Sequence, residues 1–288
     1  MNQIKLFIEL TRLKKPIGFM LLFWPCAWGL TLAYDFSNNL NNYFFYLLLF
    51  FLGSVLMRSA GCIVNDIFDK EFDKKVVRTK NRPIASGKIS VKLALIYSGV
   101  LCLIAFVVLI NFNFFTIVIA LASMPLAFTY PLMKRITYWP QLFLGITFNY
   151  GLLLGWTSIN EEISLIPIIF YFGAIFWTLG YDTIYGFQDI EDDEIIGVKS
   201  TSIKFKKSPI VFLSLCYSIF LTMLILNGYL SGFKYLYFMS LGLIAVQMYF
   251  FQLKKFNSKD PLICLKIFKS NNFLGALILI LIFIGKIN

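Results

Sequence analysis

Two short acidic segments stand out in a chain that is otherwise mostly apolar. One runs from Asn65 to Asp73 and the other from Gln188 to Glu194. Together they hold nine of the 15 acidic residues of the chain. Proteins usually bind Mg²⁺ through one or two carboxylates, with waters and substrate phosphate oxygens completing the shell. The two segments therefore predict a site for divalent cations and a phosphorylated substrate.

Within each segment the acidic side chains recur at helical spacing. Asn65, Asp69 and Asp73 are four residues apart, and so are Asp189 and Asp193. If a helix continues through each segment, these groups share one face. Like charges at this spacing destabilise a helix by about 0.2–0.5 kcal/mol per pair, so a compensating cation is expected. A solvated acidic helix end is the alternative for one segment alone, but two such segments favour the metal site.

The composition places these carboxylates in a membrane protein. The 288 residues are 59% hydrophobic and only 14% charged, with a mean hydropathy of +0.76, whereas soluble domains are about a quarter charged. Nine apolar runs are each near the ~20 residues that cross a bilayer as a helix. We therefore expect an all-α, polytopic protein of one domain, residues 1–288. The runs cover residues 17–34, 43–63, 91–110, 114–130, 140–158, 163–182, 209–227, 233–252 and 271–287.

The basic residues predict the orientation of these spans. If the spans alternate across the bilayer, 23 of the 26 Lys and Arg residues fall on one side. Cytoplasmic loops carry such an excess, so the N-terminus and both acidic segments are predicted to be cytoplasmic. The net charge of +11 then reflects topology, and no nucleic-acid partner is expected. The first span follows no signal or transit pattern, which favours a bacterial inner membrane, with a mitochondrial membrane as the alternative.

Other common chemistries are excluded by residue type. The chain has no histidine, so His-based metal sites and His acid–base catalysis are ruled out. Its five cysteines have no CxxC spacing and mostly lie in apolar runs, as expected for packing residues.

Basic side chains near the acidic segments are candidates for binding phosphate oxygens, which Arg and Lys commonly bind. For each one singly, a role in membrane orientation is the alternative. The candidates are Arg78, Arg82, Lys134, Arg135 and Lys199. Arg58 is different because it lies within the apolar run 43–63, seven residues before Asn65. A charge inside a span is costly and usually functional, so Arg58 is expected to point at the site.

The segments resemble the UbiA superfamily of membrane prenyltransferases. The first matches the motif NDxxDxxxD, with Asn65, Asp66, Asp69 and Asp73 in place. Residues 181–201 read YDTIYGFQDIEDDEIIGVKST, similar to the YDTxYAxQDxxDDxxxGVKST form of the 4-hydroxybenzoate polyprenyltransferases. Further similarity lies in 12–18, 24–25, 130–135 and 270–273. Lys14 and Gly186 depart from the usual acidic residue and alanine.

This resemblance implies nine helices around a central cavity under a cytoplasmic cap. It implies transfer of a polyprenyl group from its diphosphate to 4-hydroxybenzoate, with Mg²⁺ as cofactor, in ubiquinone biosynthesis. The implied metal ligands are Asn65, Asp69, Asp189 and Asp193, and the catalytic carboxylates are Asp66, Asp69, Asp73, Asp189 and Asp193. The implied substrate-binding residues are Arg58, Asn65, Arg78, Arg82, Tyr130, Lys134, Arg135, Asp182, Tyr185 and Lys199.

Two alternatives stay open at this point. Within the superfamily, the alternative acceptors are haem B, a dihydroxynaphthoate and a chlorophyllide, although the lack of histidine argues against haem. From another class, buried acidic residues also mark the ion paths of cation or phosphate transporters. A transport path needs polar groups through the full membrane, whereas the outer half of each predicted span is nearly free of charge. The prenyl chain length, the proton-accepting base and the oligomeric state are not predicted.

Overall fold

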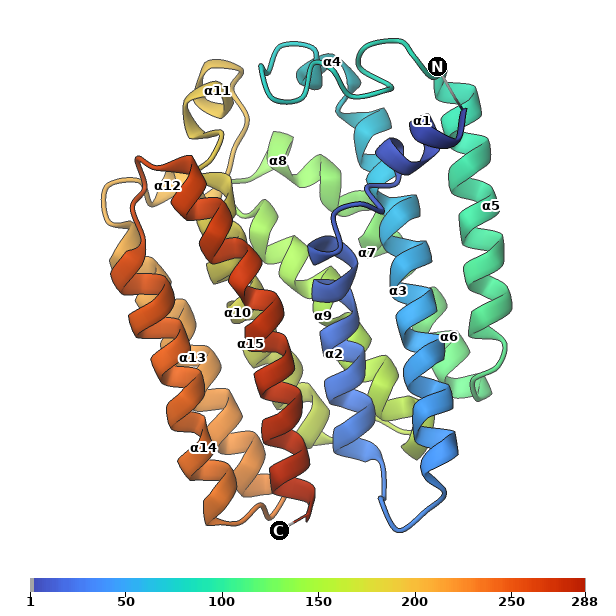
Figure 1. Cartoon of the computed structure of the whole chain (residues 1–288), viewed down its shortest axis with the longest axis vertical. Coiled ribbons are helices and arrows are strands. Elements are labelled where there is room, and N and C mark those ends of the chain that lie inside the picture. Colours follow the sequence, from blue (N-terminus) through green and yellow to red (C-terminus); the bar gives the residue numbers. More distant parts are fainter. Residues whose placement is uncertain (1–2, 288) are drawn as a thin grey trace.

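The computed structural model describes residues 3–287, and this part of the chain is a helical bundle without strands (Figure 1). The helices are α1 (Gln3–Leu10), α2 (Ile17–Ala33), α3 (Leu40–Phe68), α4 (Lys70–Asp73), α5 (Val91–Leu109), α6 (Phe114–Ala122), α7 (Met124–Thr129), η1 (Tyr130–Leu132), α8 (Met133–Ile136), α9 (Pro140–Asn160), α10 (Leu165–Gly186), α11 (Ile190–Ile195), α12 (Thr201–Lys204), α13 (Pro209–Leu230), α14 (Tyr235–Val246), η2 (Gln247–Gln252), η3 (Leu253–Lys255) and α15 (Pro261–Ile287).

The predicted nine membrane spans agree with the helices. Within residues 3–287, eight helical segments of 19 to 29 residues are long and apolar enough to cross a bilayer, and α2 is a shorter apolar helix of 17 residues. The fourth span is a broken run, Phe114–Ile136, made of α6, α7, η1 and α8. Pro125 and Pro131 lie at its breaks, since proline cannot donate the backbone hydrogen bond that continues a helix. The all-helical membrane fold is confirmed.

The centre of the bundle is a close contact between α2 and α9. A methyl group at Gly29 would lie 2.0 Å from the carbonyl oxygen of Leu152, and one at Gly155 would lie 2.2 Å from that of Cys26. Small residues let two membrane helices approach this closely, and the approach maximises van der Waals contact. The two helices therefore form a rigid scaffold for the rest of the bundle.

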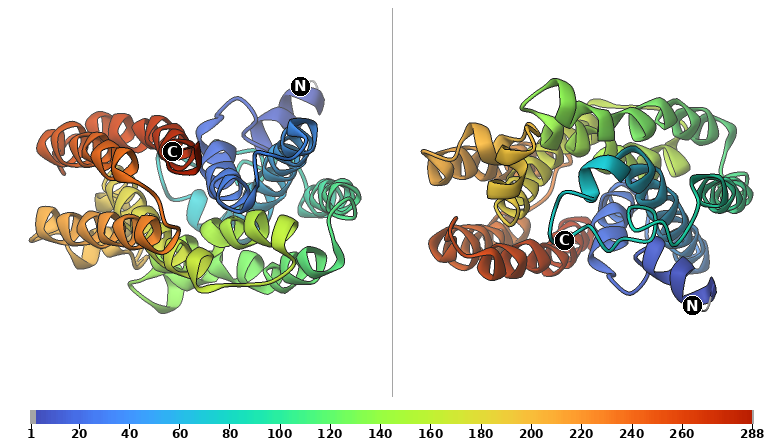
Figure 2. Two further views of the ribbon diagram at one scale, coloured as in Figure 1. Left: turned by 90° about the horizontal axis from the view of Figure 1, so that it is seen from below. Right: turned by 90° about the horizontal axis from the view of Figure 1, so that it is seen from above.

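Both acidic segments lie at the same end of this bundle. In Figure 1, α4 and α11 are at the end that carries the N-terminus, and the C-terminus is at the other end. Residues 69–90 and 187–208 connect the spans there, and we call them the first and second cap segments. Figure 2 looks along the helices, with α5 at the rim beyond α3. Two open hollows, of about 430 and 290 Å³, lie at the opposite end, beside Tyr34 and Lys286.

Each cap segment is anchored to the bundle. In the first, Ile84 and Ile89 join a buried apolar cluster with Leu6 and Leu10 of α1. In the second, the Ser202 hydroxyl donates to the carbonyl of Thr183 at 2.7 Å. A methyl group at Gly186 would lie 2.4 Å from Ser202 Oγ, so this departure from the family's alanine makes room for that bond. Each cap segment is therefore anchored beyond its acidic motif, the first at Ile84 and Ile89 and the second at Ser202.

Candidate active site

The acidic motifs lie at helix ends and not within continuous helices. α3 ends at Phe68, and Asp69 has φ −88° and ψ 0° before α4 begins. α10 ends at Gly186, and Asp189 precedes α11 with φ −122° and ψ 16°. The expectation that each helix runs through its motif is therefore wrong, because aspartate competes with the helix for backbone hydrogen bonds and favours its ends. The four-residue spacing still brings the backbone of Asp73 to Asp69, at 2.8 Å from N to O.

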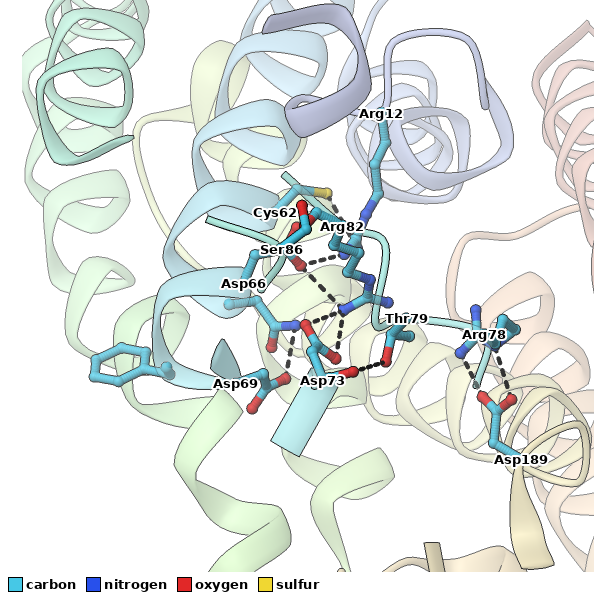
Figure 3. Close-up of polar contacts among 12 residues, drawn as sticks. Arg12, Cys62, Asp66, Asp69, Asp73, Arg78, Thr79, Arg82, Ser86 and Asp189 are labelled. Atoms are coloured by element: carbon cyan, nitrogen blue, oxygen red, sulfur yellow. Dashed lines mark hydrogen bonds and ion pairs between the residues drawn. The ribbon is translucent and has the colours of Figure 1, made fainter. Parts of the chain in front are cut away.

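Asp66 and Asp73 of the first motif are held by arginines (Figure 3). Asp66 pairs with Arg12 and with Arg82, whose Nη1 is 3.1 Å from Asp66 Oδ1. The same Nη1 is 2.8 Å from Asp73 Oδ2. The side chains of Asp66 and Asp73 are only 2% and 9% exposed. These two carboxylates are therefore committed to ion pairs within the protein.

Asp69 is the carboxylate of the first motif with bonding capacity to spare. Its Oδ2 accepts from Asn65 Nδ2 at 3.1 Å and pairs with Lys134 Nζ at 2.5 Å. Its Oδ1 is buried and has no hydrogen-bond partner. A buried carboxylate oxygen without a partner costs about 1–3 kcal/mol or more. Asn65, Asp69 and Lys134, predicted from separate segments, thus meet around an oxygen that lacks a ligand.

Arg78 joins the first cap segment to the second acidic motif. Its Nε donates to Asp189 Oδ1 at 2.7 Å, and its Nη2 pairs with Asp189 Oδ2, so the contact is bidentate (Figure 3). Such two-pronged pairs combine strength with fixed geometry. Burial, and next the neighbouring Asp189 carboxylate, raise the pKa of Asp193 to about 6. The second motif is therefore tied to the first cap segment through Arg78, and it carries a carboxylate that a cation would stabilise.

Two predicted phosphate-binding residues contact backbone carbonyls instead of carboxylates. Arg135 donates to the carbonyl oxygen of Phe68 at 2.6 Å and lies over the Phe72 ring at 5.0 Å. Lys199 donates from Nζ to the carbonyl of Ile136 at 3.1 Å. A cation at the last carbonyls of a helix stabilises that end, as Arg135 does for α3. In this structure Arg135 and Lys199 therefore brace the loops around the site.

Below the cap, polar groups from three spans face one another. The guanidinium of Arg58 in α3 lies 5.2 Å from the centroid of the Phe148 ring and interacts electrostatically with Tyr130 and Asp182. Tyr185, one turn after Asp182, interacts with Arg78 of the cap. Arg58 thus lies beside Tyr130 and Asp182, two other residues of the predicted site. The cap carboxylates and this interior group are linked through α3 and α10, the helices that end at the two motifs.

The arrangement is suited to a metal-bridged polyanion. Among residues 3–287, no three acidic or cysteine side chains form a ready-made metal site. Instead, Lys134 and Arg78 hold the carboxylates of Asp69 and Asp189. Lys134 and Arg78 both also favour the ionised form of Asp193, so a ligand that carries both phosphate oxygens and a divalent ion satisfies both sets of charges.

The family to which this chain belongs follows from comparison with known proteins. The model of the UbiA prenyltransferase family matches residues 22–277. This chain is a member of the UbiA prenyltransferase family. The matched region includes both acidic motifs and every predicted site residue, although Arg12 lies before it.

Curated relatives extend the match to almost the whole chain. The mitochondrial 4-hydroxybenzoate polyprenyltransferase of Bos taurus is 42% identical over 98% of this chain and 75% of its own length. The protein of the same name from Arabidopsis thaliana is 39% identical over 99% of this chain and 70% of its own length.

Solved structures show the same fold at lower identity. The apo UbiA homologue from Aeropyrum pernix K1 has a TM-score of 0.73 at 23% identity and covers 94% of this chain and 98% of its own. The homologue from Archaeoglobus fulgidus bound to DMAPP and Mg²⁺ has a TM-score of 0.70 at 16% identity, over 96% of this chain and 97% of its own.

Arg12 is the contact of this UbiA site that the sequence-based residue set missed. It lies in the turn between α1 and α2 with φ 56°, a left-handed conformation that is uncommon outside glycine. Besides Asp66, it contacts Cys62 Sγ at 3.6 Å. In the sequence, Arg12 is one of four basic residues before the first span, and all four can be explained by their role in orienting the spans in the membrane. Its place in the family-like segment 12–18 was the one available signal.

Proposed function

We propose that this chain transfers a polyprenyl group from a polyprenyl diphosphate to the carbon ortho to the hydroxyl group of 4-hydroxybenzoate, a step of ubiquinone biosynthesis. The observation that carries the proposal is the Arg78–Asp189 ion pair, which joins the first cap segment to the second acidic motif. The names of the relatives at 39–42% identity support the same acceptor. The function is that of an aromatic prenyltransferase embedded in a membrane.

The proposed cofactor is Mg²⁺, held by Asn65, Asp69, Asp189 and Asp193. The unpartnered, buried Oδ1 of Asp69 supports this assignment, and an all-oxygen donor set without histidine suits Mg²⁺. When bound, the ion neutralises the diphosphate and makes it a better leaving group. The Archaeoglobus fulgidus homologue binds Mg²⁺ together with DMAPP.

Substrate binding is proposed to exchange the partners of two ion pairs. Lys134 now pairs with Asp69 and Arg78 with Asp189. For these carboxylates to bind a metal ion, the two cations move to phosphate oxygens, which Arg and Lys bind well. Arg82 stays fixed because its partners, Asp66 and Asp73, are almost fully buried. We therefore assign Asp66 and Asp73 a positioning role.

The remaining basic residues and two tyrosines complete the proposed substrate site. Arg135 and Lys199 set the loop that carries Lys134, and each has donors free to turn to a phosphate oxygen. Tyr130 and Tyr185 lie between the cap and the interior, near Arg58 and Arg78. Their hydroxyl groups are suited to donate hydrogen bonds to the oxygen that joins the diphosphate to the prenyl chain.

The prenyl transfer itself is proposed to occur beneath the cap. The allylic C–O bond breaks, and the bonding electron pair leaves with the diphosphate. Aromatic faces stabilise the allyl cation, and exclusion of water protects it. Arg58 holds the carboxylate of 4-hydroxybenzoate, with Tyr130 and Asp182 beside it. The ring carbon next to the hydroxyl group attacks the cation, and the proton on that carbon is then lost.

The prenyl tail and the location fit a membrane. We propose that the tail lies against the apolar spans and that the protein resides in the inner membrane of a bacterium, with its N-terminus and the cap in the cytoplasm. The basic residues at the cap support this orientation. The relatives carry mitochondrial in their names. Fractionation of the source cells tests the location, and labelling of a cysteine introduced into a cap segment, from either side of the membrane, tests the orientation.

Turnover of purified protein tests the function. With geranyl diphosphate, 4-hydroxybenzoate and Mg²⁺, Asp69→Asn and Asp189→Asn should each lose about 100-fold or more of the activity, because even outer-shell partners of metal ligands cost about 10–100-fold. The exposed Glu191→Gln in α11 is the matched control and should retain activity. Wild-type turnover by either aspartate variant would contradict the assignment. Preferential prenylation of a dihydroxynaphthoate or haem B would contradict the acceptor.

A further inference from the structure

Gly18 lies against the guanidinium of Arg58, a cation inside the span formed by α3. It is the second residue of α2. A methyl group built on Gly18 would lie 2.8 Å from Nε of Arg58 and 3.5 Å from its Nη2. The first distance is shorter than real methyl contacts, so an alanine here requires the guanidinium to move. The bare backbone of α2 thus forms one wall of the space that holds the Arg58 guanidinium.

The helix itself gives no reason for glycine at this position. Among the described residues, the glycines with positive φ are Gly87, Gly197 and Gly232, so Gly18 has a conformation open to any residue. Glycine also weakens a helix relative to alanine. At Gly29, further along α2, the obstacle to a methyl group is the backbone of α9. At Gly18 the obstacle is the end of a flexible, charged side chain.

The Arg58 guanidinium is confined but has its charge available. On another side lies the ring of Phe148, at 5.2 Å. Among residues 3–287, Arg58 forms no ion pair within 4 Å, and Asp182 is an acidic group whose ionised form its charge favours. A cation inside a span without an ion-pair partner is costly, and an anionic ligand removes that cost.

We propose that Gly18 is a positioning residue that sets the enzyme's selectivity for an acceptor with a carboxylate. By leaving space beside α2, it fixes the Arg58 guanidinium where the carboxylate of the aromatic acceptor binds. This inference rests on the proposed function, in which Arg58 binds that carboxylate. A side chain at position 18 displaces the guanidinium while the fold stays intact, because the group that must move is the end of a long side chain.

The test compares a charged acceptor with a neutral one. Purified wild type, Gly18→Ala and Arg58→Ala are assayed with 4-hydroxybenzoate and with its methyl ester, using geranyl diphosphate and Mg²⁺. For Gly18→Ala we expect kcat/KM for the acid to fall about 10–100-fold, the size expected for a hydrogen bond to a charged group. The KM for geranyl diphosphate and the rate with the ester should change less than about twofold. Gly53→Ala is the control, since a methyl group on that α3 glycine meets nothing within 4 Å.

A double variant keeps the inference testable if Gly18→Ala folds poorly. In Gly18→Ala/Arg58→Ala the clash is gone, so stability should return and kcat/KM should equal that of Arg58→Ala alone. An additional loss in the double variant would overturn the inference, as would an equal loss of acid and ester turnover in Gly18→Ala. If wild type itself does not prefer the acid to the ester, the proposed role of Arg58 fails. If Arg58→Ala abolishes the preference and Gly18→Ala does not, the inference about Gly18 alone fails.

Discussion

The two acidic motifs are alike in sequence but are held in different ways. In the first, Asp66, Asp69 and Asp73 are between 2% and 9% exposed and pair with Arg12, Arg82 and Lys134. The second motif has Asp189 at 17% exposure with a single arginine partner, and α11, which follows Asp189, has no buried residue. The first motif is therefore part of the packed structure, whereas the second lies on a short helix at the surface.

This difference indicates a fixed half and an adaptable half of one site. Breaking a buried ion pair leaves the remaining charge without a partner and strongly destabilises the fold. An exposed ion pair, in contrast, contributes only about 0–1 kcal/mol to stability. The carboxylates of the first motif can thus define where the metal ion binds. Under the proposed function, the second motif, which Arg78 joins to the first cap segment, is the half expected to adjust when a diphosphate binds. Elements that move around ligands are generally of low local stability.

Removal of Asp66 is predicted to have the largest effect on stability. Asp66→Ala leaves Arg12 without its carboxylate and Arg82 with only Asp73, so the free energy of unfolding should fall by about 3–5 kcal/mol. Thermal unfolding in detergent measures the change. Asp192→Ala in α11 is the comparison from the second motif and should cost less than about 0.5 kcal/mol, as surface substitutions usually do. Equal losses in the two variants would remove the distinction between the motifs.

Removal of Arg78 is predicted to act on substrate binding with little change in stability. Arg78→Ala frees the second cap segment and removes a proposed phosphate partner, so KM for the prenyl diphosphate should rise about 10–100-fold. Hydrogen exchange should quicken in residues 187–199 and stay unchanged around Asp66. Arg78→Lys keeps the charge but loses the two-pronged contact, so an intermediate KM is expected. Faster hydrogen exchange in the first motif as well would show that Arg78 stabilises both acidic motifs.

The smallest effect is expected at the Lys206–Glu194 pair. Their side chains are 47% and 39% exposed, and the pair links the end of α11 to the chain beyond α12. Lys206→Gln should change the free energy of unfolding by less than about 1 kcal/mol and leave turnover unchanged. The same unfolding and activity assays apply. A large loss of turnover would show that α11 needs this anchor, which would make the second motif less adaptable than its exposure indicates.

Sequence patterns predicted the membrane spans for a clear physical reason. An apolar run of about 20 residues has no stable alternative to a helix inside a bilayer, because every backbone polar group needs a partner there. Arg58 was predicted to face the site because a charge in a span needs a polar environment. The course of the fourth span was less predictable, since prolines break it and it extends to Ile136 instead of ending near Tyr130.

The specific ion pairs were not predictable, since they join residues far apart in the chain. Arg12 is 54 residues from Asp66, and Arg78 is 111 residues from Asp189. The motif in the sequence groups Asp66, Asp69 and Asp73 together. In the structure, however, Asp66 and Asp73 pair with Arg82, whereas Asp69 pairs with Lys134. Which carboxylate keeps a free oxygen depends on burial and on which cations reach it.

By itself, the sequence determined that this is a helical membrane protein with two carboxylate motifs on one side and basic residues around them. Hydrophobicity, charge asymmetry and residue type are properties of the sequence, so each can be determined without knowledge of the tertiary structure. Only the tertiary structure decided that Asp69 has an unpartnered oxygen, that Arg78 reaches Asp189 of the second motif and that Gly18 makes room for Arg58. Those facts depend on distances between separate helices, and close packing of the bundle sets these distances.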